Sequence, residues 1–301
     1  MRNVGRVLVY VLFVAAAASS TLIGQQRALP NRPGSVKFAA IGDNGTGEQP
    51  QYEVADQMSQ LHKAFPFDLV IMLGDNMYGG QQPADFVKKF ETPYAPLLSA
   101  GVKFQASLGN HDRAENVSYK PFNMNGQRYY SYTRNNVRFF ALDSTRMDDK
   151  QLAWIDTSLQ QATEDWKICY FHHPLYSNAD RHGASVDLRV RLEPLFIKHG
   201  VNVVFSGHDH VYERVKPQKG IYYFVSGAAG QLRRGNMSPT EETAAYFDQD
   251  QSFMAVEIAG SEMYFEAVAR TGKIVDAGTI TRQAKAAASG SPRLEPAGSR
   301  R

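Results

Sequence analysis

Short runs of apolar residues recur along the chain, and most of them end at glycine, proline or polar residues. Continuous apolar runs of this length are typical of buried strands, and they predict strands at 36–41, 68–73, 102–108, 138–143, 166–171, 201–206, 221–226, 253–258, 263–269 and 274–280. Apolar residues spaced three or four apart predict helices at 51–65, 151–161 and 185–199. Strands alternate with helices at first and cluster in the last third. This order predicts an α/β domain in which helices cover two sheets.

The two ends of the chain differ in composition from the middle. Arg2 and Arg6 precede an uninterrupted apolar stretch and a group of small residues, so residues 1–26 are predicted to be a signal peptide for secretion or export to the periplasm. An uncleaved membrane anchor is the alternative, because the uncharged run is just long enough to span a bilayer. Residues 283–301 contain one large apolar residue and are predicted to be a disordered tail. The folded domain is then expected at 33–282.

Charge and cysteine content narrow the range of functions. The 301 residues have a formal net charge of +3, which is too small to argue for a nucleic-acid partner. Cys169 is the only cysteine, so no intramolecular disulfide can form and a thiolate metal site is excluded. Cys169 lies in an apolar run and is predicted to be a buried, inert residue of a strand.

Polar motifs follow several of the predicted strands. Their sequences are GDNG at 42–45, GDNMY at 74–78, GNHD at 109–112, HHP at 172–174 and GHDH at 207–210. In open α/β sheets, sites form at the carboxyl ends of strands, where these motifs lie. Carboxylate, amide and imidazole donors suit divalent or trivalent transition metals. The donors are numerous enough for two ions, and two adjacent ions activate water for attack on phosphate.

The set of motifs resembles the calcineurin-like metallophosphoesterases, and within them the small, single-domain purple acid phosphatases of the tartrate-resistant type. Most metallophosphoesterases begin with Asp-x-His, whose histidine binds the first metal, whereas this chain has Gly45 there. Purple acid phosphatases have instead a tyrosine three residues after the second aspartate, and Tyr78 occupies that position. The missing histidine and the added tyrosine therefore agree with each other. The resemblance implies a four-layer α/β/β/α sandwich that forms the catalytic domain.

The resemblance also implies two metal ions that share one aspartate. The expected ligands of the first ion are Asp43, Asp75, Tyr78 and His210. The expected ligands of the second ion are Asp75, Asn110, His172 and His208. A phenol has a pKa near 10, so only a strongly polarising ion such as Fe(III) would hold Tyr78 as phenolate. Fe(II), Zn(II) and Mn(II) all suit the second set.

Three further residues are expected to act on the substrate. In the family reading, His111 faces the substrate and either hydrogen-bonds the phosphate or protonates the leaving group. Asp112 is expected to orient His111. His182 precedes a glycine, as does a phosphate-facing histidine of the small purple acid phosphatases, although its spacing from His172 differs by about one residue.

These residues imply an acid phosphatase-like enzyme that hydrolyses small phosphate monoesters by attack of a metal-activated hydroxide. The nearest alternative is a phosphodiesterase or nucleotide pyrophosphatase on the same metal centre. Alternatives of another class are a non-catalytic binding protein on the same scaffold and a redox role of a di-iron centre. A membrane partner is expected only if the N-terminal segment is retained. No motif indicates the natural substrate or the oligomeric state.

Overall fold

The computed structural model describes residues 29–282 of the protein. The predicted signal peptide and the predicted C-terminal tail lie outside the described residues. Between residues 29 and 282, no helix combines the length and the apolar character needed to cross a membrane.

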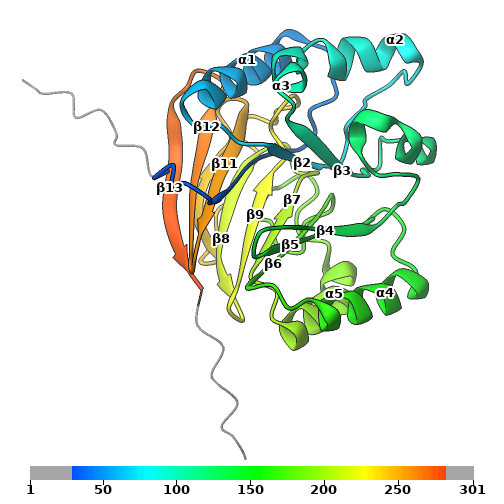
Figure 1. Cartoon of the computed structure of the whole chain (residues 1–301), viewed down its shortest axis with the longest axis vertical. Helices are drawn as coiled ribbons and strands as arrows, with labels where there is room; N and C mark the ends of the chain where they lie inside the picture. Colours follow the sequence, from blue (N-terminus) through cyan, green and yellow to red (C-terminus); the bar gives the residue numbers. More distant parts are fainter. Residues whose placement is uncertain (1–28, 283–301) are drawn as a thin grey trace, which may run out of the picture.

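Two β-sheets form the centre of the fold (Figure 1). The first sheet has the strand order β13 (Ile274–Thr281), β12 (Glu262–Ala269), β11 (Ser252–Ala259), β1 (Val36–Ile41), β2 (Leu69–Leu73) and β3 (Lys103–Ser107). The second has the order β10 (Thr243–Phe247), β8 (Tyr212–Gln218), β9 (Ile221–Ser226), β7 (Val203–Ser206), β6 (Trp166–Phe171), β5 (Val137–Ala141) and β4 (Tyr130–Arg134). Both sheets are mixed, because parallel strands occupy part of each sheet and antiparallel strands the rest.

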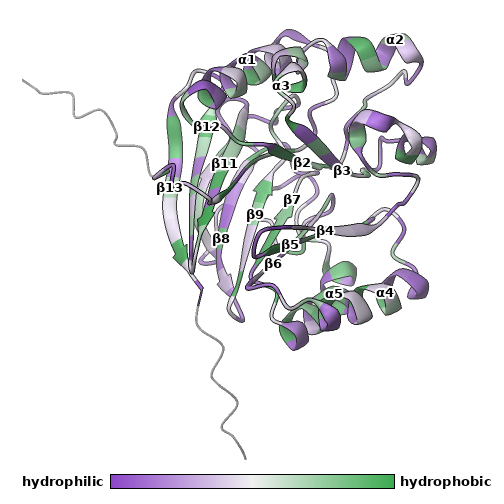
Figure 2. Ribbon diagram, viewed as in Figure 1, coloured by the Kyte–Doolittle hydropathy of each residue, from purple (hydrophilic) through white to green (hydrophobic). Residues whose placement is uncertain are grey.

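Helices cover the outer faces of both sheets, which gives four layers (Figure 1). The helices on the first sheet are α1 (Gln49–Ala64), α2 (Pro83–Phe86) and α3 (Ala95–Ser99). The helices on the second sheet are α4 (Asp149–Gln161) and α5 (Val186–His199), and α5 continues through Pro194. Figure 2 shows hydrophobic positions along the central strands β2, β7 and β9, whereas the helices carry both hydrophobic and hydrophilic positions. The expected α/β/β/α sandwich is confirmed.

Aromatic side chains pack the two sheets together. Phe38 of β1 meets Phe139 of β5 and Phe205 of β7 edge to face, with ring centroids 5.3 and 5.8 Å apart. Edge-to-face contacts of this kind are favourable, and aromatic side chains bury large apolar areas. A second apolar cluster lies between the second sheet and its helices, where Cys169 of β6 is buried near Phe196 of α5. The expectation of a buried cysteine is confirmed.

Three predicted strands, at 36–41, 166–171 and 221–226, have the same bounds in the structure. The strands β4, β8 and β10 were not predicted, because their sequences lack continuous apolar runs. β10, for example, alternates partly buried and exposed residues and forms one edge of the second sheet.

Parallel pairing decides where the polar motifs meet. The strands β1, β2 and β3 are parallel neighbours, and so are β5, β6 and β7. Parallel strands place their carboxyl ends at one edge of a sheet, so the motifs that follow these strands come together there.

Candidate metal centre

Three of the predicted metal ligands have an unusual backbone conformation. Asp43, Asp75 and His208 have φ angles of 54°, 51° and 69°. Residues other than glycine rarely adopt this left-handed region, and such strained positions concentrate at functional sites. Each residue lies just beyond a buried strand, where the chain turns sharply and directs the side chain toward the centre.

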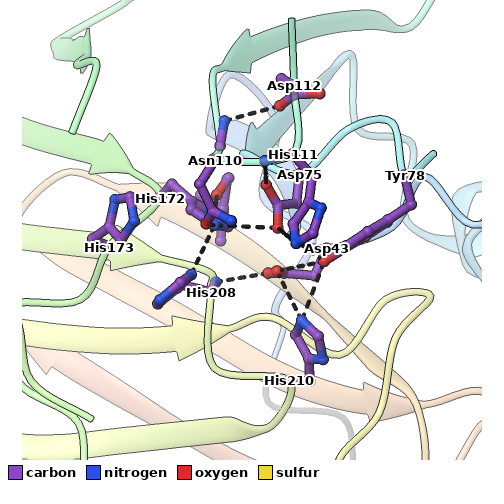
Figure 3. Close-up of polar contacts among 12 residues, drawn as sticks. Asp43, Asp75, Tyr78, Asn110, His111, Asp112, His172, His173, His208 and His210 are labelled. Atoms are coloured by element: carbon purple, nitrogen blue, oxygen red, sulfur yellow. Dashed lines mark hydrogen bonds and ion pairs between the residues drawn. The ribbon is translucent and has the colours of Figure 1, made fainter. Parts of the chain in front are cut away.

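The first predicted donor set converges on the hydroxyl of Tyr78 (Figure 3). This oxygen lies 3.0 Å from Asp43 Oδ1, 3.0 Å from Asp75 Oδ2 and 3.1 Å from His210 Nε2. His210 Nε2 is also 3.3 Å from Asp43 Oδ1. Four donor atoms from four different loop positions therefore surround one point.

The second predicted donor set converges on His172 Nε2. This nitrogen lies 3.0 Å from Asn110 Oδ1, 3.0 Å from His208 Nδ1 and 3.4 Å from Asp75 Oδ2. The other ring nitrogen, Nδ1, is 2.9 Å from the carbonyl oxygen of Leu73 and can donate its proton there, which leaves Nε2 free to bind a metal. Asp75 Oδ2 belongs to both sets, as a bridging ligand requires.

Each aspartate divides its two oxygens between the backbone and the centre. Asp43 Oδ2 accepts a hydrogen bond from the backbone N–H of His208, and Asp75 Oδ1 accepts one from the backbone N–H of His111, both at 2.8 Å. The remaining oxygen of each carboxylate faces the donor sets. These backbone bonds lock the carboxylates in place before any ligand binds.

The buried charge of the centre fits a pair of cations. Asp43 and Asp75 are 0% and 1% exposed, and among the described residues their ion-pair partners are histidines only. Burying carboxylates without a matching cation is costly. The oxygen and nitrogen donors are those that Fe, Zn and Mn accept in proteins. The residues present therefore fit a binuclear metal site.

The pKa values of the donor groups also fit a pair of bound cations. Burial, followed by the charges of Asp43 and Asp75, holds the pKa of Tyr78 far above its usual value, so a phenolate there needs a strongly polarising cation. Burial alone would lower the pKa of His172, but the charge of Asp43 and the hydrogen bond and charge of Asp75 outweigh it and raise that pKa to about 9. Burial and the charge of His172 lower the pKa of His208 to about 2, so that ring is neutral.

Gly45 occupies the position where most members of the family that the motifs resemble have a histidine, and no side chain fits there. A Cβ atom at residue 45 would lie 1.9 Å from the carbonyl oxygen of Asn76 and 2.5 Å from the backbone nitrogen of Met77. The Gly45 carbonyl accepts a hydrogen bond from the Tyr78 N–H at 2.9 Å. The backbone segment that presents Tyr78 thus packs directly against Gly45. The added tyrosine and the absent histidine are linked by steric exclusion.

Lys89 binds the backbone of the segment that carries Tyr78, a role that the sequence analysis did not predict. The residue is 6% exposed, and its Nζ donates to the carbonyl oxygens of Tyr78 and Gly80, both at 2.6 Å. Asp85 Oδ1 lies 3.3 Å from Lys89 Nζ and forms an ion pair with it. No sequence signal separates this buried lysine from its exposed neighbour Lys88.

Histidines surround the open side of the centre. The imidazole of His111 is 52% exposed, lies against the Tyr78 ring with centroids 4.7 Å apart, and has its Nε2 4.0 Å from Asp75 Oδ2. The ring of His182 lies 4.2 Å from that of His208, so the loop that carries it reaches the centre. His173 lies 4.4 Å from the His208 ring, and its Nδ1 is 2.9 Å from Ser144 Oγ.

Asp112 does not hold the ring of His111 as expected. Its Oδ2 accepts hydrogen bonds from the backbone N–H of Gly109 at 2.9 Å and from the backbone and side-chain amides of Asn76 at 3.1 and 2.8 Å. The carboxylate therefore joins the loop after β3 to the loop after β2. It positions Asn110 and the backbone of His111 rather than the imidazole, because its short side chain turns back toward its own loop.

Asp209, between two predicted ligands, also has a positioning role that the sequence did not reveal. Its Oδ2 accepts a hydrogen bond from Ser177 Oγ at 2.6 Å, and its Oδ1 accepts one from the Gly183 N–H at 3.4 Å. These contacts hold the loop that carries His182 beside the loop that carries His208.

Comparison with known proteins identifies the family. The model of the calcineurin-like phosphoesterase family matches residues 36–212, more than half of the 301 residues. The chain belongs to this family of metallophosphoesterases.

Within the family, the chain is related to the purple and tartrate-resistant acid phosphatases. It is 26% identical over 297 residues to Purple acid phosphatase 3 of Arabidopsis thaliana, with 85% of this chain and 81% of that protein covered. It is 26% identical over 301 residues to Tartrate-resistant acid phosphatase type 5 of Homo sapiens, with 83% and 92% covered.

Solved structures share the fold. Purple acid phosphatase PPD1 from yellow lupin (Lupinus luteus) seeds aligns with a TM-score of 0.69 and 20% identity, over 84% of this chain and 55% of that chain. GAP50, the anchor in the inner membrane complex of Plasmodium, aligns with a TM-score of 0.68 and 18% identity, over 83% and 90%. At these identities the likeness extends to the fold alone.

Substitution of Gly45 tests the packing beneath Tyr78. Gly45→Ala is expected to displace the segment at Asn76, to lower the metal content of the protein, and to reduce the free energy of unfolding by about 1–3 kcal/mol, as overpacking does. Elemental analysis and chemical denaturation measure the two effects. Gly126→Ala is the comparison for backbone strain alone, because open space surrounds that residue whereas its φ of 75° favours glycine, so its metal content should stay normal. Normal metal content in Gly45→Ala would contradict the steric argument.

The pKa of His172 predicts how metal affinity depends on pH. Because this pKa is raised to about 9, the metal-free imidazole carries a proton below that pH, and a metal must displace it. Zn(II) affinity is expected to rise by about tenfold per pH unit between about pH 6 and 8, with proton release. Calorimetry in buffers of different ionisation heat measures both quantities.

His173→Gln serves as the control for this titration. Burial and the charge of His172 lower the pKa of His173 to about 4, so its ring holds no proton to displace in that range. The variant should keep the slope of the wild type. A pH-independent Zn(II) affinity in the wild type would show that His172 is not a ligand.

Proposed function

We propose that the protein is a metal-dependent phosphoric monoester hydrolase of the acid phosphatase kind. The observation that carries this proposal is the pair of four-donor sets that share Asp75 Oδ2, with a solvent-exposed histidine beside them. Related acid phosphatases of similar length support the choice of monoesters over other phosphate esters.

Each metal ion has a defined place in this proposal. Fe(III) would be held by Asp43, Asp75, Tyr78 and His210, and Fe(II), Zn(II) or Mn(II) by Asp75, Asn110, His172 and His208. When bound, the pair of ions supplies an activated water nucleophile and neutralises charge on the phosphoryl oxygens. The natural substrate in this scheme is a small phosphorylated molecule.

His111 is the residue proposed to act on the leaving group. Its ring is exposed, and Nε2 points to the same Asp75 oxygen that both donor sets share. A phosphate placed across the two sets would lie within reach of this imidazole. His111 can donate a hydrogen bond to a phosphoryl oxygen and a proton to the departing oxygen. Asp112 serves it indirectly, by holding the loop that carries it.

His182 is proposed to face the phosphate from the opposite side, next to His208. Burial, followed by the positive charges of nearby groups with Arg233 first among them, lowers the pKa of His182. A positive potential of this kind attracts an anionic substrate to the centre. The neutral ring can still hydrogen-bond a phosphoryl oxygen.

The cellular location of the protein is proposed from its N-terminal sequence. Residues 1–26 have the basic start, apolar stretch and small residues of a signal peptide, so we propose that the protein is secreted or exported to the periplasm. None of the predicted metal ligands is a cysteine, and Cys169 is the only cysteine of the chain. An oxidising compartment would therefore not oxidise a ligand of the metal centre.

A visible absorption spectrum with metal analysis tests the proposed centre. Protein purified without chelator is expected to contain about two metals per chain and to show a broad visible band from charge transfer between the Tyr78 phenolate and Fe(III). Tyr78→Phe is expected to lose the band. A colourless protein with two Zn or Mn ions would remove the Fe(III) assignment and favour phosphodiesters or nucleotides, which a substrate panel would then decide.

Two substitutions separate metal binding from catalysis. Asp75→Asn is expected to lose both metals and the phosphatase activity, because Asp75 Oδ2 belongs to both donor sets. His111→Ala is expected to keep the metals and to lower kcat by about 10²–10⁴-fold, the usual effect of removing a general acid. Elemental analysis and steady-state kinetics measure both, with Asp68→Asn on the exposed surface as the control. Full activity in Asp75→Asn would refute the scheme.

A further inference from the structure

The loop after β9, residues 227–242, packs along the backbone of the metal centre, although none of the predicted ligands belongs to it. Two of its backbone N–H groups donate to carbonyl oxygens of predicted ligands. The Gln231 N–H donates to Asp43 at 2.9 Å, and the Arg233 N–H donates to His210 at 3.0 Å. Figure 3 shows the side chains of Asp43 and His210 directed at each other in the first donor set. The loop is therefore one backbone hydrogen bond away from two members of that set.

A glycine at the start of this loop allows the close approach. A Cβ atom at Gly227 would lie 2.2 Å from the carbonyl oxygen of Asp209 and 2.8 Å from Asp43 Oδ2. The loop thus packs directly against the segments that supply Asp43 and His210. No side chain separates it from the first donor set at this point.

The same loop also pairs with the segment that carries His182. The Asp180 N–H donates to the carbonyl oxygen of Asn236 at 2.8 Å, next to an antiparallel β-bridge between the two segments. The ring of His182 in turn lies 4.2 Å from that of His208. Residues 231–236 therefore connect the first donor set to the histidine that lies beside the second.

The guanidinium of Arg233, in the middle of this connection, has no partner in the part of the chain that the structure describes. Its Nε is buried and donates no hydrogen bond, and the carboxylates of the centre pair with histidines instead. The residue as a whole is only partly exposed. A buried donor without an acceptor is costly, and the cost is greater when the donor is charged. A ligand that supplies the acceptor would account for this arginine.

The charge of Arg233 acts toward the metal centre. After burial, it is the largest cause of the lowered pKa of His182, whose ring lies against that of His208. Arg234, the next residue, differs in both respects. It is exposed, and its Nε donates to the carbonyl oxygen of Gln249 at 3.1 Å. Of the two adjacent arginines, only Arg233 is thus available to an oxyanion at the centre.

We propose that Arg233 is a catalytic residue that binds the phosphoryl group of the substrate beside the first donor set. This inference rests on the proposed phosphatase function. The N–H groups of a guanidinium match two oxygens of one phosphate, and hydrogen bonds between ionised partners are the strong ones. The contact holds the phosphoryl group near His182 and offsets the charge that develops on its oxygens during hydrolysis.

Binding of inorganic phosphate to the metal-loaded full chain, measured by calorimetry, tests the contact. Arg233→Met replaces the guanidinium with an uncharged side chain and is expected to weaken phosphate binding by roughly 10–100-fold, the usual contribution of a hydrogen bond to a charged group. Arg233→Lys keeps the charge but loses the paired N–H groups, so it should recover only part of the affinity. Arg234→Met is the matched control and is expected to bind phosphate as the wild type does.

Steady-state kinetics with 4-nitrophenyl phosphate give a second readout. Arg233→Met is expected to lower kcat/KM by roughly 10²–10³-fold, with part of the loss in kcat, because the contact strengthens as charge develops on the phosphoryl oxygens. Elemental analysis should find the metal content of the wild type in all three variants. A loss of metal in Arg233→Met would show that the arginine supports the donor sets and would overturn its assignment to the substrate.

The stability of the variants separates substrate binding from a structural role. Because Arg233 has no partner among the described residues, Arg233→Met is expected to keep or raise the midpoint of chemical denaturation when phosphate is absent. Added phosphate should raise the midpoint of the wild type more than that of Arg233→Met, since a ligand stabilises the state that binds it. A midpoint that falls in Arg233→Met without phosphate would indicate a structural arginine and contradict the proposal.

The outcomes distinguish this inference from the proposed function. If the wild type hydrolyses the ester and Arg233→Met binds phosphate as tightly as the wild type, the role of Arg233 is overturned and the phosphatase function stands. If the wild type hydrolyses no phosphate ester, the phosphatase function is overturned, and calorimetry alone decides whether Arg233 binds an oxyanion at the centre.

Discussion

The position of one oxygen atom, Asp75 Oδ2, governs the arrangement of the metal centre. It lies 3.0 Å from the Tyr78 hydroxyl and 3.4 Å from His172 Nε2, and so it joins the two donor sets. A strained left-handed backbone and a hydrogen bond from the N–H of His111 hold the carboxylate in that orientation. Gly109 allows the approach, since a Cβ atom there would lie 2.2 Å from Asp75 Oδ1. Because Gly109 has no side chain, the loop after β3 can pack directly against Asp75.

The donors come from both sheets, so the packing between the sheets sets the dimensions of the centre. Asp43, Asp75 and Asn110 follow strands of the first sheet, whereas His172 and His208 follow strands of the second. The contacts of Phe38 with rings of the second sheet hold these two groups at a fixed separation. Ions bound between carboxylates of one sheet and imidazoles of the other would in turn stabilise the native state, since they bind it and not the unfolded chain.

Around this fixed centre, the surrounding loops determine chemistry and selectivity. Asp112 and Asp209 use their carboxylates to join neighbouring loops. These loops carry His111, which lies against the Tyr78 ring, and His182, which lies against the His208 ring. Ser144 contacts His173 in the same way, because its Oγ lies 2.9 Å from the ring Nδ1 and accepts a hydrogen bond from the His173 backbone N–H at 3.0 Å. Short polar side chains at strand ends thus position the longer side chains that would meet a substrate.

Local patterns in the chain were enough to predict the strands at 36–41, 166–171 and 221–226, the layered α/β class and the family, because continuous apolar runs and short motifs are local features. They also singled out the residues that gather at the centre. Three features follow from contacts in the folded chain alone: Gly45 must lack a side chain, Lys89 holds the Tyr78 segment, and Asp112 binds groups of the neighbouring loops instead of an imidazole. These contacts join separate loops, and such packing leaves no pattern of spacing in the chain.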